Sequence, residues 1–217
     1  MPPAVILIGL LGRSRVGKDT VADALVAALA TFGARAEIWR LSQPLKDAVR
    51  SLYGFCENQI EGSEKELADP RYGITPRVAI NRLCEHMMAN HGVTFFTRRL
   101  YEALDSVVGT DSIAAADSAV AADSAVRAVI IPDVRYAHDI SEIRRRGGLV
   151  VKIHRDVAAA GYALHPWENH IDLMEADVTL ENDRTLTDLR AAVVSEVLPR
   201  ALALLPTPQP PQPPETA

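Results

Sequence analysis

Apolar positions along the chain form short continuous runs, which alternate with longer segments where apolar residues recur every three or four positions. The short runs have the length of strands and predict strands buried in a sheet. They lie at residues 5–8, 36–41, 128–133, 149–153 and 177–180. Strands that alternate with helices form parallel sheets covered on both faces. The pattern therefore predicts an α/β protein, a three-layer αβα sandwich around a mostly parallel sheet of about five strands.

The segments between the runs predict the helical layers. After the first run, Val21, Leu25 and Leu29 recur at helical spacing and Gly33 follows them, which predicts a helix over residues 20–32. Further helices are expected from a capping Ser42 onward, over 75–90 with a buried stripe of Val78, Leu83 and Met87, over 95–104, over 140–146, and over 186–205 after a turn and cap at Asn182 and Asp183. Together these elements form one domain over residues 1–205.

Three stretches do not follow this alternation. Residues 55–72 are polar and irregular, which predicts a mobile excursion over the site. Residues 115–120 and 121–126 repeat the same hexapeptide, and this unit is too short for a solenoid, so we expect a surface insertion. The proline-rich residues 206–217 predict an extended, disordered tail.

The composition narrows the class of protein. Apolar residues make up 48% of the 217 residues, which is typical of a soluble protein with a substantial core. A net charge of −5 argues against a stable nucleic-acid partner. Cys56 and Cys84 form no Cys-x-x-Cys pair, so neither a disulfide framework nor a zinc site is indicated, and the cytoplasm is the expected location. The first apolar run reaches Gly9 without a basic leader, which favours a core strand over a signal peptide or membrane span.

Residues 12–20 have the pattern of a phosphate-binding loop between a strand and a helix. Gly12 and Gly17 let the backbone turn so that N–H groups point at phosphate oxygens, and Lys18 reaches the β and γ phosphates. Asp19 stands where the usual pattern has a hydroxyl residue, and Thr20 follows one place later. Nucleoside monophosphate kinases such as adenylate kinase also carry their threonine late, so Thr20 is the candidate hydroxyl near Mg²⁺.

Two further positions at the carboxyl ends of strands carry candidate chemistry. Asp133 ends a buried run, as a Walker B-like acid does, and is a candidate for holding Mg²⁺ directly or through water. Arg135 follows with a guanidinium that suits a phosphate; the alternative is a loop ion pair with Asp133. Lys46 lies near the predicted loop, and the alternative for it is a solvated lysine on a helix.

The segment at residues 165–170 superficially suggests a metal site. It contains His165, Glu168 and His170, but their spacing fits neither the zinc-protease helix motif nor its inverted form. Pro166 also disfavours a helix through the set. A metal role is therefore not expected here.

With these residues identified, the chain resembles the phage-type deoxynucleoside monophosphate kinases, a branch of the P-loop kinases, over most of residues 4–205. The resemblance rests on the loop end Gly17-Lys18-Asp19-Thr20, the segments Pro44-Leu45-Lys46-Asp47-Ala48 and Pro132-Asp133-Val134-Arg135, Gly147-Gly148 before a strand, and Asn182-Asp183 followed by Leu186 and Leu189. It implies the P-loop kinase fold, with residues 55–127 as a helical acceptor and lid region that contains the tandem repeat.

The resemblance also implies the activity, its cofactors and its residues. The reaction would be transfer from ATP, with Mg²⁺, to a deoxynucleoside monophosphate, with small-molecule nucleotides as partners and a homodimer left open. The donor residues would be Gly12, Ser14, Arg15, Gly17, Lys18, Asp19 and Thr20, and the metal residues Thr20 and Asp133. The acceptor residues would be Leu45, Lys46, Arg71, Arg77, Phe96, Asp133 and Arg135, of which Asp133 and Arg135 are also catalytic, together with Lys18. Arg98 and Arg99 would lie on a segment that closes over the site.

The acceptor half departs from the family pattern. Ile80, Leu83 and Cys84 stand where the family tends to carry a glutamine and a Gly-Thr pair, so the base preference stays open. Three alternatives remain: a phosphomevalonate kinase, whose loop also ends in Gly-Lys-Asp; a kinase acting on a modified nucleotide in DNA; and a nucleotide-binding regulator without transfer activity.

Overall fold

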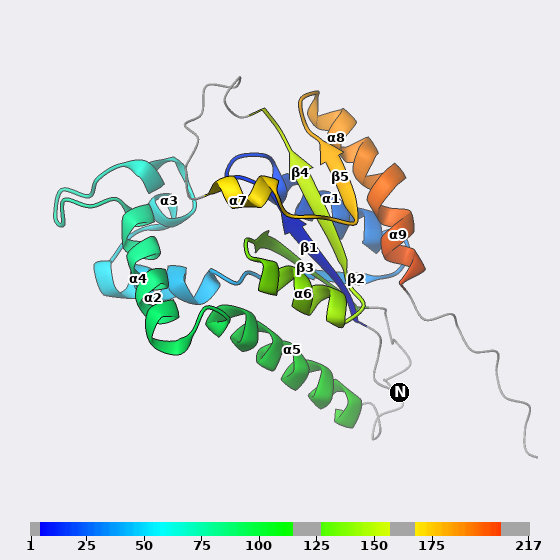
Figure 1. Cartoon of the computed structure of the whole chain (residues 1–217), viewed down its shortest axis with the longest axis horizontal. Helices are drawn as coiled ribbons and strands as arrows, with labels where there is room; N and C mark the ends of the chain where they lie inside the picture. Colours follow the sequence, from blue (N-terminus) through cyan, green and yellow to red (C-terminus); the bar gives the residue numbers. More distant parts are fainter. Residues whose placement is uncertain (1–4, 115–126, 157–167, 205–217) are drawn as a thin grey trace, which may run out of the picture.

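The computed structural model describes residues 5–114, 127–156 and 168–204, and it contains a five-stranded parallel sheet (Figure 1). The tandem repeat, the proline-rich tail and His165 lie outside the described residues. The strands are β1 (Val5–Leu11), β2 (Arg35–Ile38), β3 (Arg127–Val134), β4 (Leu149–His154) and β5 (Val178–Glu181). Their order is β2-β3-β1-β4-β5, and each neighbouring pair is parallel. The predicted α/β sheet is confirmed.

Helices cover both faces of the sheet and give the predicted three layers (Figure 1). One face packs against α1 (Lys18–Ala30), α8 (Leu186–Ala192), a π-helical turn (Val193–Val197) and α9 (Leu198–Ala203). The other face packs against α5 (Phe95–Ala114), α6 (Ala137–Arg145) and α7 (Asn169–Asp172). Within the described ranges, no helix is long and apolar enough to cross a bilayer.

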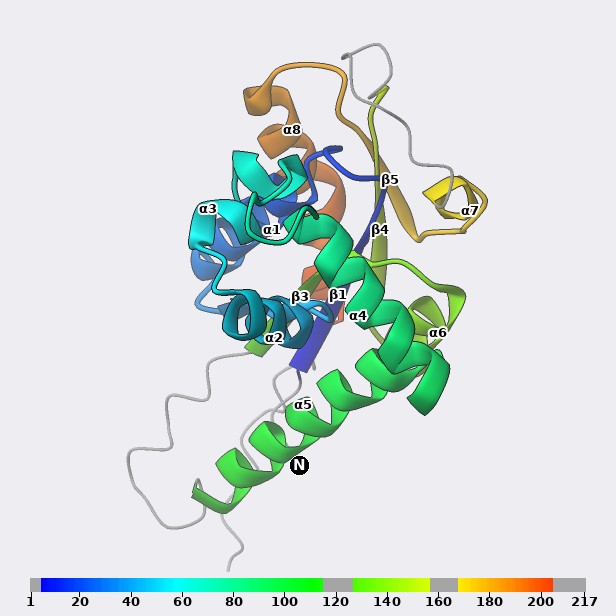
Figure 2. The ribbon, with the colours of Figure 1, turned by 90° about the vertical axis from the view of Figure 1, so that its left-hand side faces the viewer.

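A third group of elements stands to one side of the sheet (Figure 2). It comprises α2 (Gln43–Tyr53), α3 (Glu57–Ile60), the 3₁₀ turn η1 (Ser63–Glu66) and α4 (Pro76–His91). The prediction of an irregular stretch over 55–72 is wrong, because Phe55 and Ile60 are buried in a satellite core with Leu45 and Val49. Two well-placed apolar residues among many polar ones are enough to anchor this segment.

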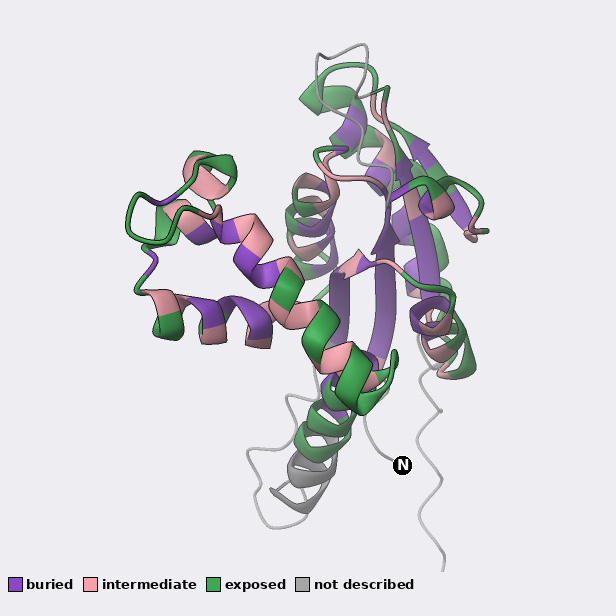
Figure 3. Ribbon diagram, turned by 60° about the vertical axis from the view of Figure 1, so that its left-hand side comes forward, coloured by how far each residue is buried: buried purple, intermediate pink, exposed green. Residues whose placement is uncertain are grey.

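The side chains of the central strand are buried on both faces of the sheet (Figure 3). Ile6 and Ile8 of β1 join the core beneath α1, whereas Leu7 and Leu11 join the core beneath α6. Gly9 lets α6 approach closely, since a Cβ there would lie 2.4 Å from Cδ1 of Ile143. The carboxyl end of β1, from which the loop at residues 12–20 begins, is therefore held by packing against helices on both faces of the sheet.

Several predicted helix details need correction. In α4 the buried positions are Pro76, Ala79 and Ile80, with Leu83 half-buried, because the first half of the helix packs against α2 and α3. Helix α5 continues ten residues past the predicted end at 104. The C-terminal helix begins with a capping box at Thr185 rather than at Asn182 and Asp183, and a π-helical turn interrupts it before α9.

Candidate active site

The loop between β1 and α1 is shaped for phosphate and is fixed from the far end of the chain. Gly17 has φ 100° immediately before the first helical residue, a conformation that favours glycine. Nδ2 of Asn182 donates to the main-chain oxygen of Val16 at 2.8 Å, and a Cβ on Gly17 would lie 2.6 Å from that nitrogen. Asn182 was expected as a turn and cap, and its role at the loop was missed.

Lys18 lies inside the loop. Its Nζ donates to the main-chain oxygens of Gly12 and Arg13 at 2.8 and 2.7 Å. Burial, together with the nearby charge of Arg135, lowers the pKa of Lys18 to about 7. An anion bound in the loop would restore the charged form, so the structure places Lys18 where the sequence predicts a phosphate-binding cation.

Glu168 supplies a carboxylate to this loop and was missed as a site residue. The main-chain N–H of Ser14 donates to its two oxygens at 3.1 and 3.2 Å, and the Ser14 hydroxyl donates at 3.0 Å. Nη1 of Arg135 donates to the same carboxylate at 2.9 Å, and the Glu168 side chain is only 3% exposed. Burial alone would raise the pKa of Glu168, but the hydrogen bonds from Ser14 and Arg135 lower it below its usual value.

The backbone around Arg135 is held by a second buried carboxylate. Oδ2 of Asp139 accepts the main-chain N–H groups of Arg135 and Tyr136 at 3.1 and 3.0 Å, and its Oδ1 accepts the Thr97 hydroxyl at 2.5 Å. On the other side, Nε2 of His170 lies 2.9 Å from the main-chain oxygen of Arg135. These contacts join α5, α6 and α7 around Arg135, which follows β3.

Asp133 does not pair with Arg135 but holds the start of α2. Its Oδ1 accepts the N–H of Leu41 at 2.9 Å, and its Oδ2 accepts the N–H and hydroxyl of Ser42 at 2.8 and 2.6 Å. The expected side-chain cap by Ser42 is therefore wrong, since α2 has no side-chain cap and the hydroxyl bonds Asp133 instead. Thr20 and Asp133, the predicted Mg²⁺ residues, line two different cavities.

The first cavity, of about 410 Å³, opens beside α1 and contains the predicted donor residues Arg15, Gly17, Lys18, Asp19 and Thr20. Sequence reasoning missed the rest of its lining. These residues are Arg155, Asn182, Arg184, Leu186 and Leu189. Its guanidinium groups suit phosphate and its leucines suit an apolar ring, so the cavity has the chemistry of a nucleotide site.

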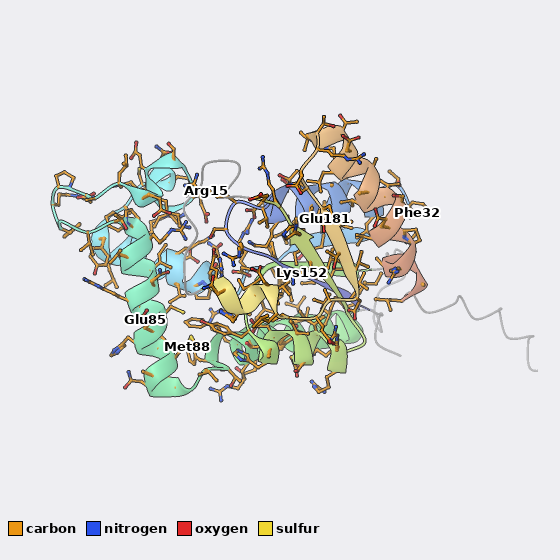
Figure 4. All side chains as sticks on the ribbon, turned by 45° about the horizontal axis from the view of Figure 1, so that its top comes forward. Arg15, Phe32, Glu85, Met88, Lys152 and Glu181 are labelled. Atoms are coloured by element: carbon orange, nitrogen blue, oxygen red, sulfur yellow. The ribbon has the colours of Figure 1, made fainter. Side chains whose placement is uncertain are left out.

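The second cavity, of about 590 Å³, lies between the sheet edge and α4, the helix that bears Glu85 and Met88 (Figure 4). Six of the seven predicted acceptor residues line it: Leu45, Lys46, Arg77, Phe96, Asp133 and Arg135. Arg71 does not, because the carboxylate of Asp69, two residues earlier, binds its main-chain N–H, Nε and Nη2 at 2.8 to 2.9 Å. The structure therefore does not bring Arg71 into this cavity, and its acceptor role stays a prediction.

Cations gather at one end of the second cavity. Lys46 is 6% exposed and forms a 2.7 Å ion pair with Glu61, so the alternative of a solvated lysine is excluded. Arg77 pairs with Glu66. Lys65 lies near both cations, and burial followed by their charges lowers its pKa to about 8. The arrangement can hold a dianionic phosphate.

Aromatic side chains also line the second cavity. Tyr136 stacks on His138 with a centroid distance of 5.2 Å and on His170 at 5.8 Å. Phe96 lies across the cavity and is packed edge-on against Phe95. Tyr136, His138 and His170 were not predicted as site residues. Arg98 and Arg99 are exposed on α5 and do not line the cavity.

Comparison with known proteins gives one curated relative. No family model matches the chain. A protein of Acanthamoeba polyphaga mimivirus named "Putative deoxynucleotide monophosphate kinase" is 25% identical over 195 residues, which covers 88% of this chain and 95% of that protein.

Among solved structures, remote neighbours include two small kinases. The Mycobacterium tuberculosis APS kinase CysC in complex with AMPPNP and APS is 14% identical, with a TM-score of 0.44, and the alignment covers 91% of this chain and 99% of that chain. Shikimate kinase from Aquifex aeolicus is 12% identical, with a TM-score of 0.42 and the same coverage. The α/β fold is established by the sheet order of this chain itself.

Proposed function

We propose that the protein is an ATP-dependent kinase that transfers the γ-phosphoryl group to a deoxynucleoside monophosphate and gives the diphosphate. The observation that carries this proposal is the position of Arg135 beside both the second cavity and the phosphate loop. Arg135 lines the cationic second cavity, and it is joined through Glu168 to Ser14 of the phosphate loop. A phosphotransferase needs this arrangement, because donor and acceptor phosphates must meet in line.

The first cavity suits the donor. Lys18 and the loop N–H groups would hold the β and γ phosphates of ATP, and Arg15, Arg155 and Arg184 would surround the rest of the nucleotide. Thr20 offers a hydroxyl for Mg²⁺. Asp133 would act on the ion through water, because both of its oxygens already accept main-chain N–H groups. When bound, the ion supplies charge neutralisation at the β and γ phosphates.

The second cavity suits the acceptor. Its volume of about 590 Å³ lies in the range of small-molecule sites. Lys46 and Arg77 would bind the monophosphate, and Phe96 would contact the base. The name of the mimivirus relative also supports a nucleotide acceptor.

The residues of this chain would act by charge and position. The transition state of phosphoryl transfer is loose and anionic, so catalysis depends on alignment and charge stabilisation. Lys18 would stabilise the donor phosphates and Arg135 the transferring group, which requires no covalent intermediate on the protein.

The experiment is an acceptor panel. Labelled ATP, Mg²⁺ and the full chain are incubated with deoxynucleoside monophosphates, ribonucleoside monophosphates, phosphomevalonate or DNA that contains a modified base. We expect transfer to at least one deoxynucleoside monophosphate. Transfer to phosphomevalonate or DNA alone would replace the proposal with that alternative, and ATP binding without transfer to any acceptor would indicate a regulator.

A further inference from the structure

Glu168 has no role in the proposed reaction, yet its carboxylate lies on groups that the loop would offer to phosphate. It accepts the main-chain N–H and hydroxyl of Ser14 and the guanidinium of Arg135. A loop N–H, a hydroxyl and an arginine fork are also the donors that typically bind a phosphate oxygen. The carboxylate therefore occupies an anion site built from donor and acceptor elements.

We propose that Glu168 competes with the donor phosphates for Ser14 of the phosphate loop and for Arg135, and that bound phosphates displace the carboxylate. Two anions cannot share these hydrogen-bond donors, because like charges a few ångströms apart repel strongly where water is excluded. The Glu168 side chain is 3% exposed, so solvent does not screen this repulsion. Binding of ATP thus requires the carboxylate to leave Ser14.

The hydrogen bonds of Lys18 are consistent with this competition. Its Nζ donates to the carbonyl oxygens of Gly12 and Arg13, two groups within the loop. A bound phosphate would offer Nζ a charged acceptor, which makes shorter and stronger hydrogen bonds than a carbonyl group. The protein itself therefore satisfies the donors that would bind phosphate: Glu168 accepts from Ser14 and Arg135, and two main-chain carbonyl groups accept from Lys18.

The exchange would also affect Arg135. Nη1 of Arg135 donates to Glu168 at 2.9 Å. Once the carboxylate leaves, this donor turns to the incoming phosphate, on the side that faces the acceptor cavity. Glu168 is thus a positioning residue: it keeps Arg135 beside the loop before ATP binds, and it lowers the affinity for ATP by competition.

The test compares ATP affinity in two variants of the full chain. Glu168→Gln keeps the shape of the side chain and removes its charge. Asp172→Asn is the matched control, because Asp172 lies four residues later and pairs with the side chain of Arg13, without contacting a loop N–H. The dissociation constant of Mg-ATP is measured by titration calorimetry without an acceptor.

We expect Glu168→Gln to tighten ATP binding about tenfold, as loss of one competing charged hydrogen-bond set predicts. Asp172→Asn should change the constant by less than about twofold, since its ion pair is half-exposed. Unchanged or weaker binding by Glu168→Gln, or equal tightening in both variants, would overturn the proposal.

A measurement on the unmodified protein covers the case in which Glu168→Gln does not fold. Hydrogen exchange is followed on adding Mg-ATP, and we expect slower exchange at residues 12–18 and faster exchange at residues 168–172. Slower hydrogen exchange in both segments would contradict the displacement of Glu168 by the donor phosphates.

The inference rests on the proposed function only as far as the loop binds ATP. Failure of transfer in the acceptor panel would leave these readouts intact, whereas absence of ATP binding by the unmodified protein would contradict both proposals.

Discussion

Asn182 and Val16 are 166 residues apart in sequence, yet the Asn182 amide donates to the main-chain oxygen of Val16 at 2.8 Å. The contact braces the phosphate loop against the segment after β5. We expect Asn182→Ala to raise the KM for ATP about tenfold, because a hydrogen bond that fixes the loop is lost, and to leave the acceptor KM unchanged. Asp183→Asn, at the next residue, is the control. Equal effects of the two substitutions on the ATP KM would contradict the bracing role.

Lys18→Met should nearly abolish phosphoryl transfer while the fold survives. The substitution keeps the length and apolar stem of the side chain but removes the charge from the loop. Initial rates with saturating ATP and acceptor give kcat, and circular dichroism checks the fold. A folded variant that retains most of the rate would contradict the mechanism.

The same substitution should stabilise the nucleotide-free protein near neutral pH. The pKa of Lys18 is lowered to about 7, so between pH 7 and the unfolded pKa the unfolded chain binds the extra proton. The penalty for burying Lys18 is therefore full below pH 7 and disappears as the pH rises toward 10. We expect Lys18→Met to raise the free energy of unfolding by at least about 1 kcal/mol at pH 7, with a smaller difference at pH 9.5. Urea unfolding of both proteins at several pH values measures this difference in the free energy of unfolding. A difference that grows with pH would contradict the lowered pKa of Lys18.

Arg135→Ala should reduce kcat/KM by about a hundredfold or more, because a charge-assisted contact to the transferring phosphoryl group is lost. Arg135→Lys should recover part of the rate, since it restores the charge without the planar fork. Arg144→Ala, which removes an exposed ion pair with Asp177, is the control. Steady-state kinetics separates these outcomes, and an unchanged kcat/KM for Arg135→Ala would leave this arginine with a structural role only.

Arg77 and Arg71 form a matched pair. Arg77 lines the acceptor cavity, whereas Arg71 is bound by Asp69 outside it. We expect Arg77→Ala to raise the acceptor KM at least tenfold with an unchanged ATP KM, because one charged contact to the monophosphate disappears. Arg71→Ala should lower the melting temperature and leave both KM values near their original level. The reverse pattern would restore the role that the sequence assigned to Arg71.

The sheet, its helical layers and the phosphate loop could be predicted from the sequence because each depends on local pattern. Apolar runs specify the strands, and the spacing of Gly12, Gly17 and Lys18 specifies the loop. The resemblance to a known family supplied six of the twenty residues that line the second cavity. These signals lie within short segments, so no tertiary information was needed to find them.

The missed features depend on contacts between distant segments. Glu168 and Asn182 reach the loop from more than 150 residues away, and nothing in their own neighbourhoods indicates this. Arg71 lies outside the second cavity because the carboxylate of Asp69, two residues earlier, accepts from three of its donors, a contact that the residue pattern alone did not indicate. The order within residues 55–72 depends on Phe55 and Ile60, whose burial becomes visible only when α2 and α4 are in place.

Asp133 joins the central part of the sheet to the first helix of the acceptor region through three hydrogen bonds to Leu41 and Ser42. Lys46 lies one turn farther along that helix, so the position of an acceptor cation is set by a carboxylate at the end of β3. A displacement of this carboxylate would therefore move the start of α2 and, with it, the lysine that lines the second cavity.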